Sequence, residues 1–208
     1  MIISNCKQGS PEWSLARIGI PTASEFSKLV TSTGQPSKSM SDYARVLAAE
    51  SWAGKPVDGW NGNKYTDRGK ELEPEARAWY EFQTGQEVAE VGFVTDDLKR
   101  YGCSPDGLIR PDGGVEFKCC IAKEHIKYLE YIAKHHKAPS GFVAQCQGEM
   151  YVCELDWVDL VFYHPDLPCK ILRQTPNGSF IRMLKAQIKA VEAERNIVLR
   201  FLKEQDNA

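Results

Sequence analysis

The segment around the Pro111-Asp-Gly-Gly turn constrains the fold more than any other part of the chain. Residues 107–110 and 114–119 have the composition of strands, and so short a connection between them is typical of a tight hairpin. Pro105 cannot donate to a strand ladder, and the Asp106-Gly dipeptide favours a turn. The sequence therefore predicts a strand that breaks at Asp106, followed by a short connection and an antiparallel return.

The returning strand is predicted to have one charged face and one apolar face. Successive side chains of a strand point to opposite sides, so Glu116 and Lys118 share one side. The other side carries Val115, Phe117 and Cys119. The antiparallel return can bring Asp106 within a few ångströms of Glu116, so we expect two carboxylates beside one lysine.

Two carboxylates beside a lysine suit metal-assisted hydrolysis of a phosphodiester. Mg²⁺ prefers carboxylate oxygens and keeps waters that a phosphate can replace, which makes Asp106 and Glu116 candidate ligands. A metal held there polarises the phosphate and lowers the pKa of a bound water, and Lys118 is placed to orient that water or to stabilise charge developing on phosphorus. The alternative is a surface hairpin on which Glu116 and Lys118 form a solvated pair worth under about 1 kcal/mol.

Helices and strands are predicted along most of the remaining chain. Thr22-Ala-Ser24-Glu25 has the form of a capping box and predicts a helix start after Pro21. Further helices are predicted over residues 41–52, 67–82, 123–136 and 140–153, and from residue 178 toward the C-terminus. Further strands are predicted over residues 87–95, 99–104, 157–163 and 170–175.

Composition excludes several classes of protein. With 208 residues, 42% hydrophobic and 26% charged, the chain resembles ordinary globular proteins, and its length favours a single domain over residues 1–208. No stretch approaches the roughly 18 consecutive apolar residues of a membrane span, and no signal peptide is recognisable. Seven cysteines, including the adjacent pair Cys119-Cys120, favour a reducing cytoplasm over a disulfide framework. The formal charge of -2 does not exclude a nucleic-acid substrate, because affinity depends on where the cations lie.

Several sequence blocks connect this hairpin to a known family. Pro105-Asp106, Glu116 and Lys118 resemble the P-D…(D/E)-x-K core shared by many restriction and repair nucleases. Five blocks between residues 13 and 147 then occur in the order found in the phage lambda exonuclease family of alkaline exonucleases. They are Trp13-Ser-Leu-Ala-Arg17-Ile-Gly-Ile-Pro-Thr22-Ala-Ser24-Glu25, Arg68-Gly-Lys70-Glu-Leu-Glu73, Cys103-Ser-Pro-Asp106-Gly, Val115-Glu-Phe-Lys118-Cys119 and Ala144-Gln145-Cys-Gln147. Their joint occurrence is specific, although no single block is.

The resemblance implies a fold and a reaction. The fold is α/β, with a restriction-endonuclease-like core in which helices flank a central mixed β-sheet. The reaction is 5′-to-3′ digestion of one strand of linear duplex DNA from its end, which gives single-stranded DNA for homologous recombination by single-strand annealing. A homotrimeric ring around DNA and a single-strand annealing protein as partner are implied by the same likeness.

The resemblance also implies roles for individual residues. Asp106 and Glu116 would bind Mg²⁺ together with the main-chain carbonyl of Phe117, and Glu73 would serve a second ion; Mn²⁺ is expected to substitute. Lys118 would assist the attacking water, and Gln145 would position water or substrate.

Arg17 and Ser24 match the residues that hold the 5′ phosphate in this family. The residues themselves favour this role in part, because a helix N-terminus offers free N–H groups to an anion, so that Thr22–Glu25 could form a pocket with Arg17 as its fork-shaped donor. The alternative is that Arg17 and Ser24 only support the helix cap.

Other polar segments are weaker candidates. The Lys- and His-rich helix 123–136 is typical of a solvated face and is kept as a patch that could contact the DNA backbone. It contains His125 and His135, and His136 ends it. Lys38 lies in a polar loop that differs from the lambda protein in length and composition. Trp13 and Trp79 are expected to be packing residues. The role of the C-terminal helix, in packing or in subunit contact, stays open.

Two other functions compete with the exonuclease. One is an endonuclease or repair nuclease with the same P-D…E-x-K core that cuts internally. The other is a DNA-end-binding protein without catalysis, although the intact set of Glu73, Asp106, Glu116 and Lys118 speaks against it.

Overall fold

The computed structural model describes residues 1–57 and 64–207. The helices are α1 (Pro11–Ala16), α2 (Met40–Ala53), α3 (Lys64–Thr84), α4 (Ala122–His135), α5 (Ser140–Cys153) and α6 (Gly178–Asp206), with a 3-10 helix η1 (Ala23–Lys28). The strands are β1 (Ile2–Ser4), β2 (Phe93–Thr95), β3 (Gly102–Cys103), β4 (Gly107–Ile109), β5 (Gly113–Lys118), β6 (Trp157–Phe162) and β7 (Lys170–Gln174). None of the helices in the described ranges combines the length and the apolar character needed to cross a membrane.

The strands form two sheets. In the first, β1, β2 and β3 pair antiparallel in that order. In the second, β4, β5, β6 and β7 follow one another, with β5 and β6 parallel and the outer pairs antiparallel. The predicted hairpin is the β4–β5 pair, and the predicted mixed sheet flanked by helices is confirmed.

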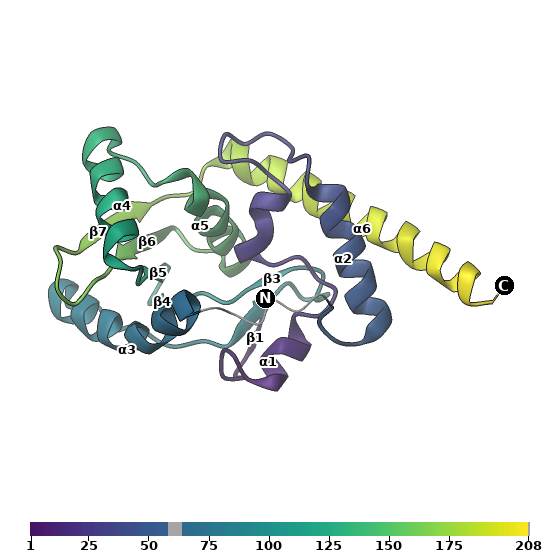
Figure 1. Cartoon of the computed structure of the whole chain (residues 1–208), viewed down its shortest axis with the longest axis horizontal. Helices are drawn as coiled ribbons and strands as arrows, with labels where there is room; N and C mark the ends of the chain where they lie inside the picture. Colours follow the sequence, from purple (N-terminus) through teal and green to yellow (C-terminus); the bar gives the residue numbers. More distant parts are fainter. Residues whose placement is uncertain (58–63, 208) are drawn as a thin grey trace.

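Helices cover both faces of the mixed sheet. Parallel neighbours need a long crossover connection, which α4 and α5 provide between β5 and β6. In Figure 1, α4 lies on one side of the strands and α3 on the other. The carboxyl end of β5, which carries Lys118, therefore lies between helices.

Side chains of β5 alternate as the sequence predicts. Val115 and Phe117 are buried in a cluster with Tyr80 of α3, whose ring centroid lies 6.1 Å from that of Phe117. Glu116 and Lys118 point the other way and make their hydrogen bonds with α5. One face of this strand is therefore structural, and the other is available for chemistry.

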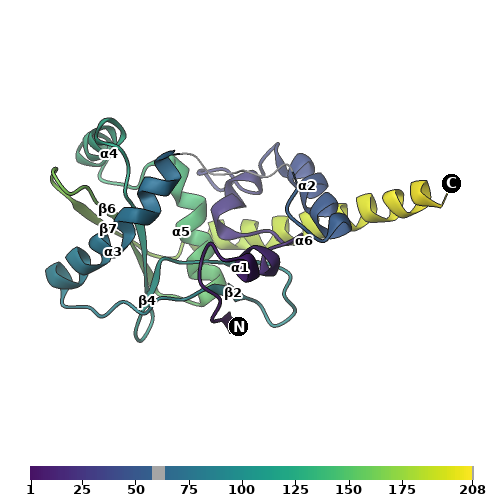
Figure 2. The ribbon, with the colours of Figure 1, turned by 60° about the horizontal axis from the view of Figure 1, so that its bottom comes forward.

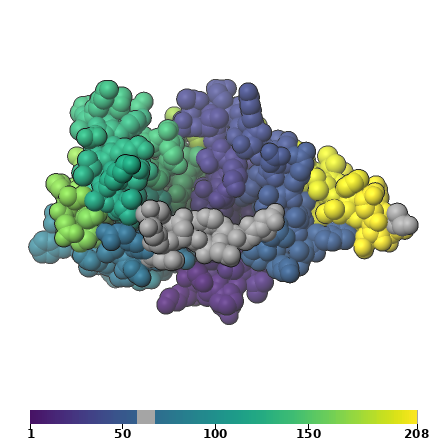
Figure 3. Space-filling model, in the orientation of Figure 1, coloured from purple at the N-terminus to yellow at the C-terminus, as the bar shows by residue number. Residues whose placement is uncertain are grey.

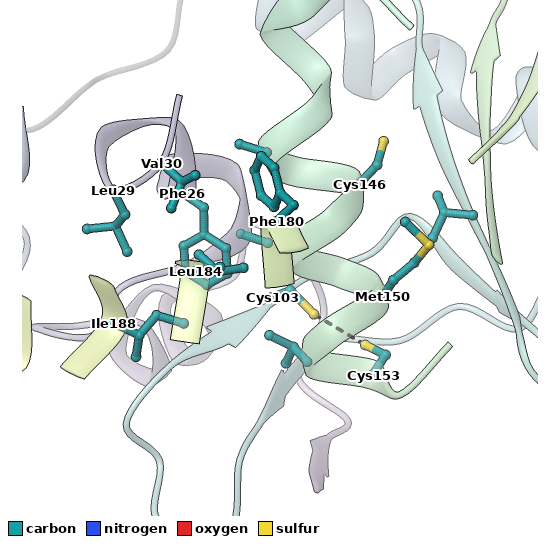
Figure 4. Close-up of a cluster of buried hydrophobic side chains, with 14 of the residues drawn as sticks. Phe26, Leu29, Val30, Cys103, Cys146, Met150, Cys153, Phe180, Leu184 and Ile188 are labelled. Carbon is teal, nitrogen blue, oxygen red and sulfur yellow. Dashed lines mark hydrogen bonds between the residues drawn. The ribbon is translucent and has the colours of Figure 1, made fainter. Parts of the chain in front are cut away.

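The largest apolar cluster joins segments that are far apart in the sequence. Figure 4 shows Phe26 of η1 beside Leu184 of α6, with Met150 on the other side of α5, and all three are buried members of the cluster. The thiols of Cys103 and Cys153 meet in the same cluster, with their sulfur atoms 3.2 Å apart. Burial of this apolar surface holds η1 and α6 against α5.

A glycine of α5 allows η1 to approach closely. A Cβ atom at Gly148 would lie 2.4 Å from the Phe26 ring and 3.1 Å from the Cβ of Ala23. Neither distance leaves room for a side chain. The absence of a side chain at position 148 therefore fixes the distance between η1 and α5.

The structure corrects three predictions and adds two short elements. The strand predicted over residues 99–104 forms only at Gly102–Cys103, because residues 96–101 make a turn closed by hydrogen bonds between Asp96 and Tyr101 and between Lys99 and Asp96. The segment predicted as a strand over residues 87–95 pairs as a strand only at Phe93–Thr95, because a single bridge, Ala89 to Leu108, holds its first half. The capping box does not form, because the Thr22 hydroxyl makes no cap hydrogen bond and η1 is a 3-10 helix. β1 and α1 were not predicted, since three and six residues are too few to show periodicity.

The C-terminal helix extends beyond the rest of the chain. Its buried residues, Phe180, Leu184, Ile188 and Val191, all belong to its first half. Figure 2 shows the last turns of α6 projecting past α2, and Figure 3 shows the same end standing out from the body of the molecule. Ile197 and Phe201 on this end are 56% and 55% exposed.

Candidate active site

The β4–β5 register places Asp106 beside Glu116. Gly107 pairs with Val115, so the residue before β4 faces the residue that follows Val115. An Asp106 carboxylate oxygen (Oδ2) accepts a hydrogen bond from the backbone N–H of Phe117 at 2.6 Å. The sequence expectation that these two carboxylates lie close together agrees with this geometry.

Lys118, Glu116 and Gln145 form a closed hydrogen-bond network. Lys118 Nζ donates to Glu116 Oε1 at 2.6 Å and to Gln145 Oε1 at 3.0 Å. Gln145 Nε2 donates to the same Glu116 oxygen at 2.6 Å. The strand β5 supplies the ion pair and α5 supplies the amide, so two elements fix one constellation.

Glu149 is a further member of this network that the sequence reasoning missed. Its Oε1 accepts a hydrogen bond from Gln145 Nε2 at 3.0 Å, and the residue is only 1% exposed. Gln145 and Glu149 are four residues apart and therefore lie on one face of α5. That spacing is visible in the sequence, but nothing in it shows that the carboxylate is buried.

Glu73 approaches the site from α3. Arg77 Nη2 donates to Glu73 Oε1 at 3.1 Å, and Arg77 also pairs with Glu90. The pKa of Glu73 is raised, mainly because the carboxyl group is buried. The positive charge of Arg77 lowers this pKa, and the negative charge of Glu116 raises it. The three carboxylates of Glu73, Asp106 and Glu116 are therefore close enough to influence one another.

The site concentrates negative charge around one cation. Burial, followed by the charges of Glu116 and Glu73, raises the pKa of Asp106 well above its usual range. Burial and Glu116 do the same to Glu149. Burial lowers the pKa of Lys118, but the neighbouring carboxylates of Glu116 and Asp106 outweigh it and raise that pKa overall. With Arg77 already paired to Glu73 and Glu90, one ammonium group does not neutralise the carboxylates of Asp106, Glu116 and Glu149, so the site favours additional positive charge.

The donor set fits a divalent cation. Glu116 is 4% exposed, and its second oxygen, Oε2, has no hydrogen-bond partner in the described ranges. Within residues 1–57 and 64–207, no three His, Cys, Asp or Glu side chains converge as a finished metal site. A buried, unpartnered carboxylate oxygen beside two other carboxylates is nevertheless the chemistry that Mg²⁺ prefers.

A second constellation surrounds Arg17. Its guanidinium lies within hydrogen-bond distance of the hydroxyls of Ser104, Thr22 and Ser24, at 3.5, 3.4 and 3.4 Å. It stacks over the ring of Trp13 at 4.1 Å, and the Trp13 indole N–H donates to Ser104 at 2.7 Å. In the described part of the chain, no carboxylate forms an ion pair with it. A fork-shaped cation among three hydroxyls is suited to an anion such as a phosphate.

Ser104 and Trp13 are members of this constellation that the sequence reasoning did not assign to it, whereas Thr22 belongs to the helix start that was expected to form the pocket. Ser104 lies next to Pro105-Asp106, so β3 and the turn after it connect the two constellations along the chain. The hydroxyls of Thr22 and Ser24 lie 3.3 Å apart. Both hydroxyls face Arg17 and do not cap η1. This arrangement is consistent with the absence of the predicted capping box.

The remaining candidates lie outside both constellations. His125 is fully buried and its Nε2 lies 2.9 Å from the carbonyl of Pro168, so its assignment to a solvated face was wrong. His135, His136 and Lys38 are exposed. Trp79 is half-buried and packs against Tyr163, as expected of a packing residue. A surface hollow of about 490 Å³, lined in part by Tyr101 and Tyr151, shares no residue with the site.

Comparison with known proteins identifies the relatives of this chain. Residues 12–156 match the family described as the YqaJ-like viral recombinase domain. An alkaline exonuclease (LHK-Exo) from Laribacter hongkongensis is 30% identical, with a TM-score of 0.82, over 95% of this chain and 98% of that chain. The same enzyme in complex with dAMP matches at 28% identity with the same TM-score and coverage. No curated protein sequence matches the chain.

A more distant structure agrees in fold. A phage-related exonuclease from Haemophilus somnus 129PT has a TM-score of 0.70 at 16% identity, over 88% of this chain and 96% of that chain. These structures share the restriction-endonuclease-like arrangement of a mixed sheet with flanking helices. Nucleases of this superfamily usually use divalent metal ions. The chain belongs to the YqaJ-like viral recombinase domain family, and this membership together with the likeness to an alkaline exonuclease makes it a nuclease that acts on DNA.

Proposed function

We propose that the chain is a Mg²⁺-dependent exonuclease that digests one strand of linear duplex DNA in the 5′-to-3′ direction. The observation that carries this proposal is the network at the end of β5, where Lys118 and Gln145 meet Glu116 beside Asp106. The full-length likeness to an alkaline exonuclease supports it. Residues 1–208 form a single nuclease domain in this proposal.

The proposal assigns a role to each residue of the network. Asp106, Glu116 and the main-chain carbonyl of Phe117 hold one ion, and Glu73 serves a second. Bound Mg²⁺ supplies a polarised phosphate and a water of lowered pKa, and Mn²⁺ is expected to substitute. Lys118 donates to the attacking water or to a phosphate oxygen, where its positive charge stabilises the charge that develops on phosphorus.

Gln145 is a positioning group in this scheme. Its carbonyl oxygen accepts from Lys118 and its amide donates to Glu116, so it holds the ammonium and the carboxylate in a fixed relation. Hydrolysis then consumes one water, breaks one P–O bond and leaves a phosphate on the released nucleotide. The dAMP complex of the similar enzyme agrees with a mononucleotide product.

The constellation around Arg17 supports the proposed polarity. Its guanidinium and the hydroxyl of Ser24 would bind the terminal 5′ phosphate, with Ser104 and Thr22 as further donors. A site that binds the 5′ phosphate near the metal-binding carboxylates places the first phosphodiester bond for cleavage. This geometry favours an enzyme that starts at ends over an endonuclease that cuts internally.

Further parts of the proposal rest on the family alone. They are a homotrimeric ring around DNA, a single-strand annealing protein as partner, a phage-type recombination role and a cytoplasmic location. The reaction can be tested without any of them. A DNA-end-binding protein without catalysis remains the alternative from another class.

End-labelled linear duplexes that differ only in which terminus carries a phosphate test reaction, polarity and end recognition together. We expect Mg²⁺-dependent release of label from 5′-phosphorylated ends and no loss of closed circular duplex. Rapid cleavage of the circle would favour the endonuclease. Binding of ends without cleavage under all metal conditions would favour the non-catalytic reading, and activity in excess EDTA would contradict the metal scheme.

Lys118→Ala separates catalysis from binding in the same assay. We expect cleavage to be lost while duplex ends are still bound, because Lys118 acts on the reacting phosphate. Lys170→Ala is a matched control, since Lys170 is an exposed lysine of β7 that lies outside both constellations and outside helix α4. Equal loss of binding and cleavage in Lys118→Ala would show that this lysine is mainly structural.

A further inference from the structure

The structure assigns Glu149 as the residue that orients the Gln145 amide, and through it Lys118, for the proposed hydrolysis. This inference rests on the proposed function. It concerns a carboxylate that lies one helical turn beyond Gln145 and is not one of the residues that match the motif blocks of the nuclease core. Glu149 is therefore a positioning residue, acting through a neighbour.

The hydrogen bonds of Gln145 leave its amide one favourable orientation. Both hydrogens of Nε2 are used, one toward Glu116 Oε1 at 2.6 Å and one toward Glu149 Oε1 at 3.0 Å. Its oxygen accepts from Lys118 at 3.0 Å. A flipped amide would set NH₂ against the ammonium group and its oxygen against two carboxylates, so each contact would become repulsive.

Glu149 and Glu116 differ in the other groups that their carboxylates contact. Glu116 also accepts from Lys118 and is a proposed ligand of the metal, so its geometry must change as ions and DNA come and go. For Glu149, the hydrogen-bond donor in the described ranges is Gln145, and its carboxylate also lies close enough to that of Glu116 for the two to interact. Its helix spacing of four residues holds it directly behind that amide. Glu149 is thus the acceptor that stays in place while the rest of the site changes.

The burial of Glu149 indicates that its carboxylate has a role other than stabilising the fold. The residue is 1% exposed on the inward face of α5, and its second oxygen, Oε2, has no partner in the described part of the chain. Burying a carboxylate with an unsatisfied oxygen is costly, and an apolar residue of similar size is generally tolerated better at such a position. A role in the site accounts for this arrangement.

Two substitutions of similar size separate the role from simple packing. Glu149→Met fills the same space without an acceptor, and Glu149→Gln restores an acceptor oxygen without the charge. We expect Glu149→Met to lower kcat by about 10- to 100-fold, the usual effect of removing an outer partner of a metal-site residue, with KM for duplex ends unchanged. Glu149→Gln should recover most of that loss. Glu87→Ala, which removes an exposed carboxylate between α3 and β2, serves as the control with no effect.

Two readouts other than activity test the positioning role. In NMR spectra, the Gln145 side-chain amide hydrogens should be shifted and slow to exchange in the wild type, and one of them should lose this protection in Glu149→Met. Calorimetric binding of Ca²⁺ without DNA should be the same in both proteins, because Glu149 is not a ligand here. Gln145→Ala should cost as much as Glu149→Met, and the double variant no more, because the two residues act as a unit.

Several outcomes would overturn this inference. They are full activity of Glu149→Met, independent and multiplicative effects of the two single variants, and a loss of Ca²⁺ affinity that parallels the loss of activity. Glu149→Gln as inactive as Glu149→Met would show that the charge is needed, and would overturn it as well. A wild type without nuclease activity would instead refute the proposed function, so the two failures are distinguishable.

Discussion

Arg17 shows how the environment of one residue can define a binding site. The guanidinium stacks on Trp13 and faces three hydroxyl groups, and within the described ranges it lacks an ion-pair partner. Burial lowers the pKa of this group, because water no longer surrounds the charge. Stacking on Trp13 orients the guanidinium, and its two-pronged set of N–H donors is suited to bind an oxyanion.

Arg17→Ala should therefore weaken the preference for 5′-phosphorylated ends. The ratio of initial rates on phosphorylated and hydroxyl-terminated duplexes should fall toward one, because only the phosphate depends on the guanidinium. Arg17→Lys should retain part of the ratio, since a point charge replaces the two-pronged donor. Arg45→Ala is the control, because Arg45 is an exposed arginine that pairs with Asp42 on α2. An unchanged ratio in Arg17→Ala would remove the assignment of this pocket.

At the scale of elements, α5 connects the two constellations. Its inward face carries Gln145 and Glu149 toward β5. Gly148 on the same helix contacts η1, and the start of η1 places Thr22 and Ser24 beside Arg17. The distance from η1 to α5 thus sets the distance from the phosphate pocket to the network. A close helix contact is a rigid way to fix that distance, because packed interiors resist compression.

Gly148→Ala should destabilise the protein even though alanine is the better helix former. Alanine gains about 1 kcal/mol of helix propensity over glycine, but a Cβ 2.4 Å from the Phe26 ring forces repacking that costs about 1–3 kcal/mol. Gly141→Ala on the same helix is the matched control, because its Cβ would meet open space, and it should be neutral or stabilising. Urea unfolding of both variants measures the difference. Equal stability of the two variants would show that η1 shifts without cost.

The sequence predicts the helices and strands better than it predicts the contacts between segments that are distant in the sequence. Helices α2, α4 and α5 and the β4–β5 hairpin follow from periodicity, turn residues and the glycine after α2, because these signals are local. The site residues of β5 follow from alternation. Burial of Glu149 and the hydroxyl partners of Arg17 depend on contacts between distant segments, which no local pattern encodes. The same reason explains why the sequence left open whether Thr22 caps a helix or contacts Arg17, which is the contact that it makes.

At the scale of the whole molecule, α6 is anchored at one end only. Arg195 donates from Nη1 to the carbonyl of Gly19 at 2.5 Å, near the point where the buried residues of the helix end. Beyond it, Ile197 and Phe201 are exposed on the projecting turns. A short helical end without tertiary packing is marginal in water, because helices gain most of their stability in proteins from a buried face.

This arrangement makes a prediction about the proposed homotrimer. If another copy covers the projecting end, backbone amides of residues 197–206 should resist hydrogen exchange at concentrations where light scattering gives the trimer mass. Dilution to the monomer should remove that protection, because the exposed Ile197 and Phe201 then lose their cover. Amides around Leu184 and Ile188 should stay protected in both states, since these side chains are buried within one chain. Protection of the end in the monomer, or a trimer with an unprotected end, would show that α6 takes no part in subunit contact.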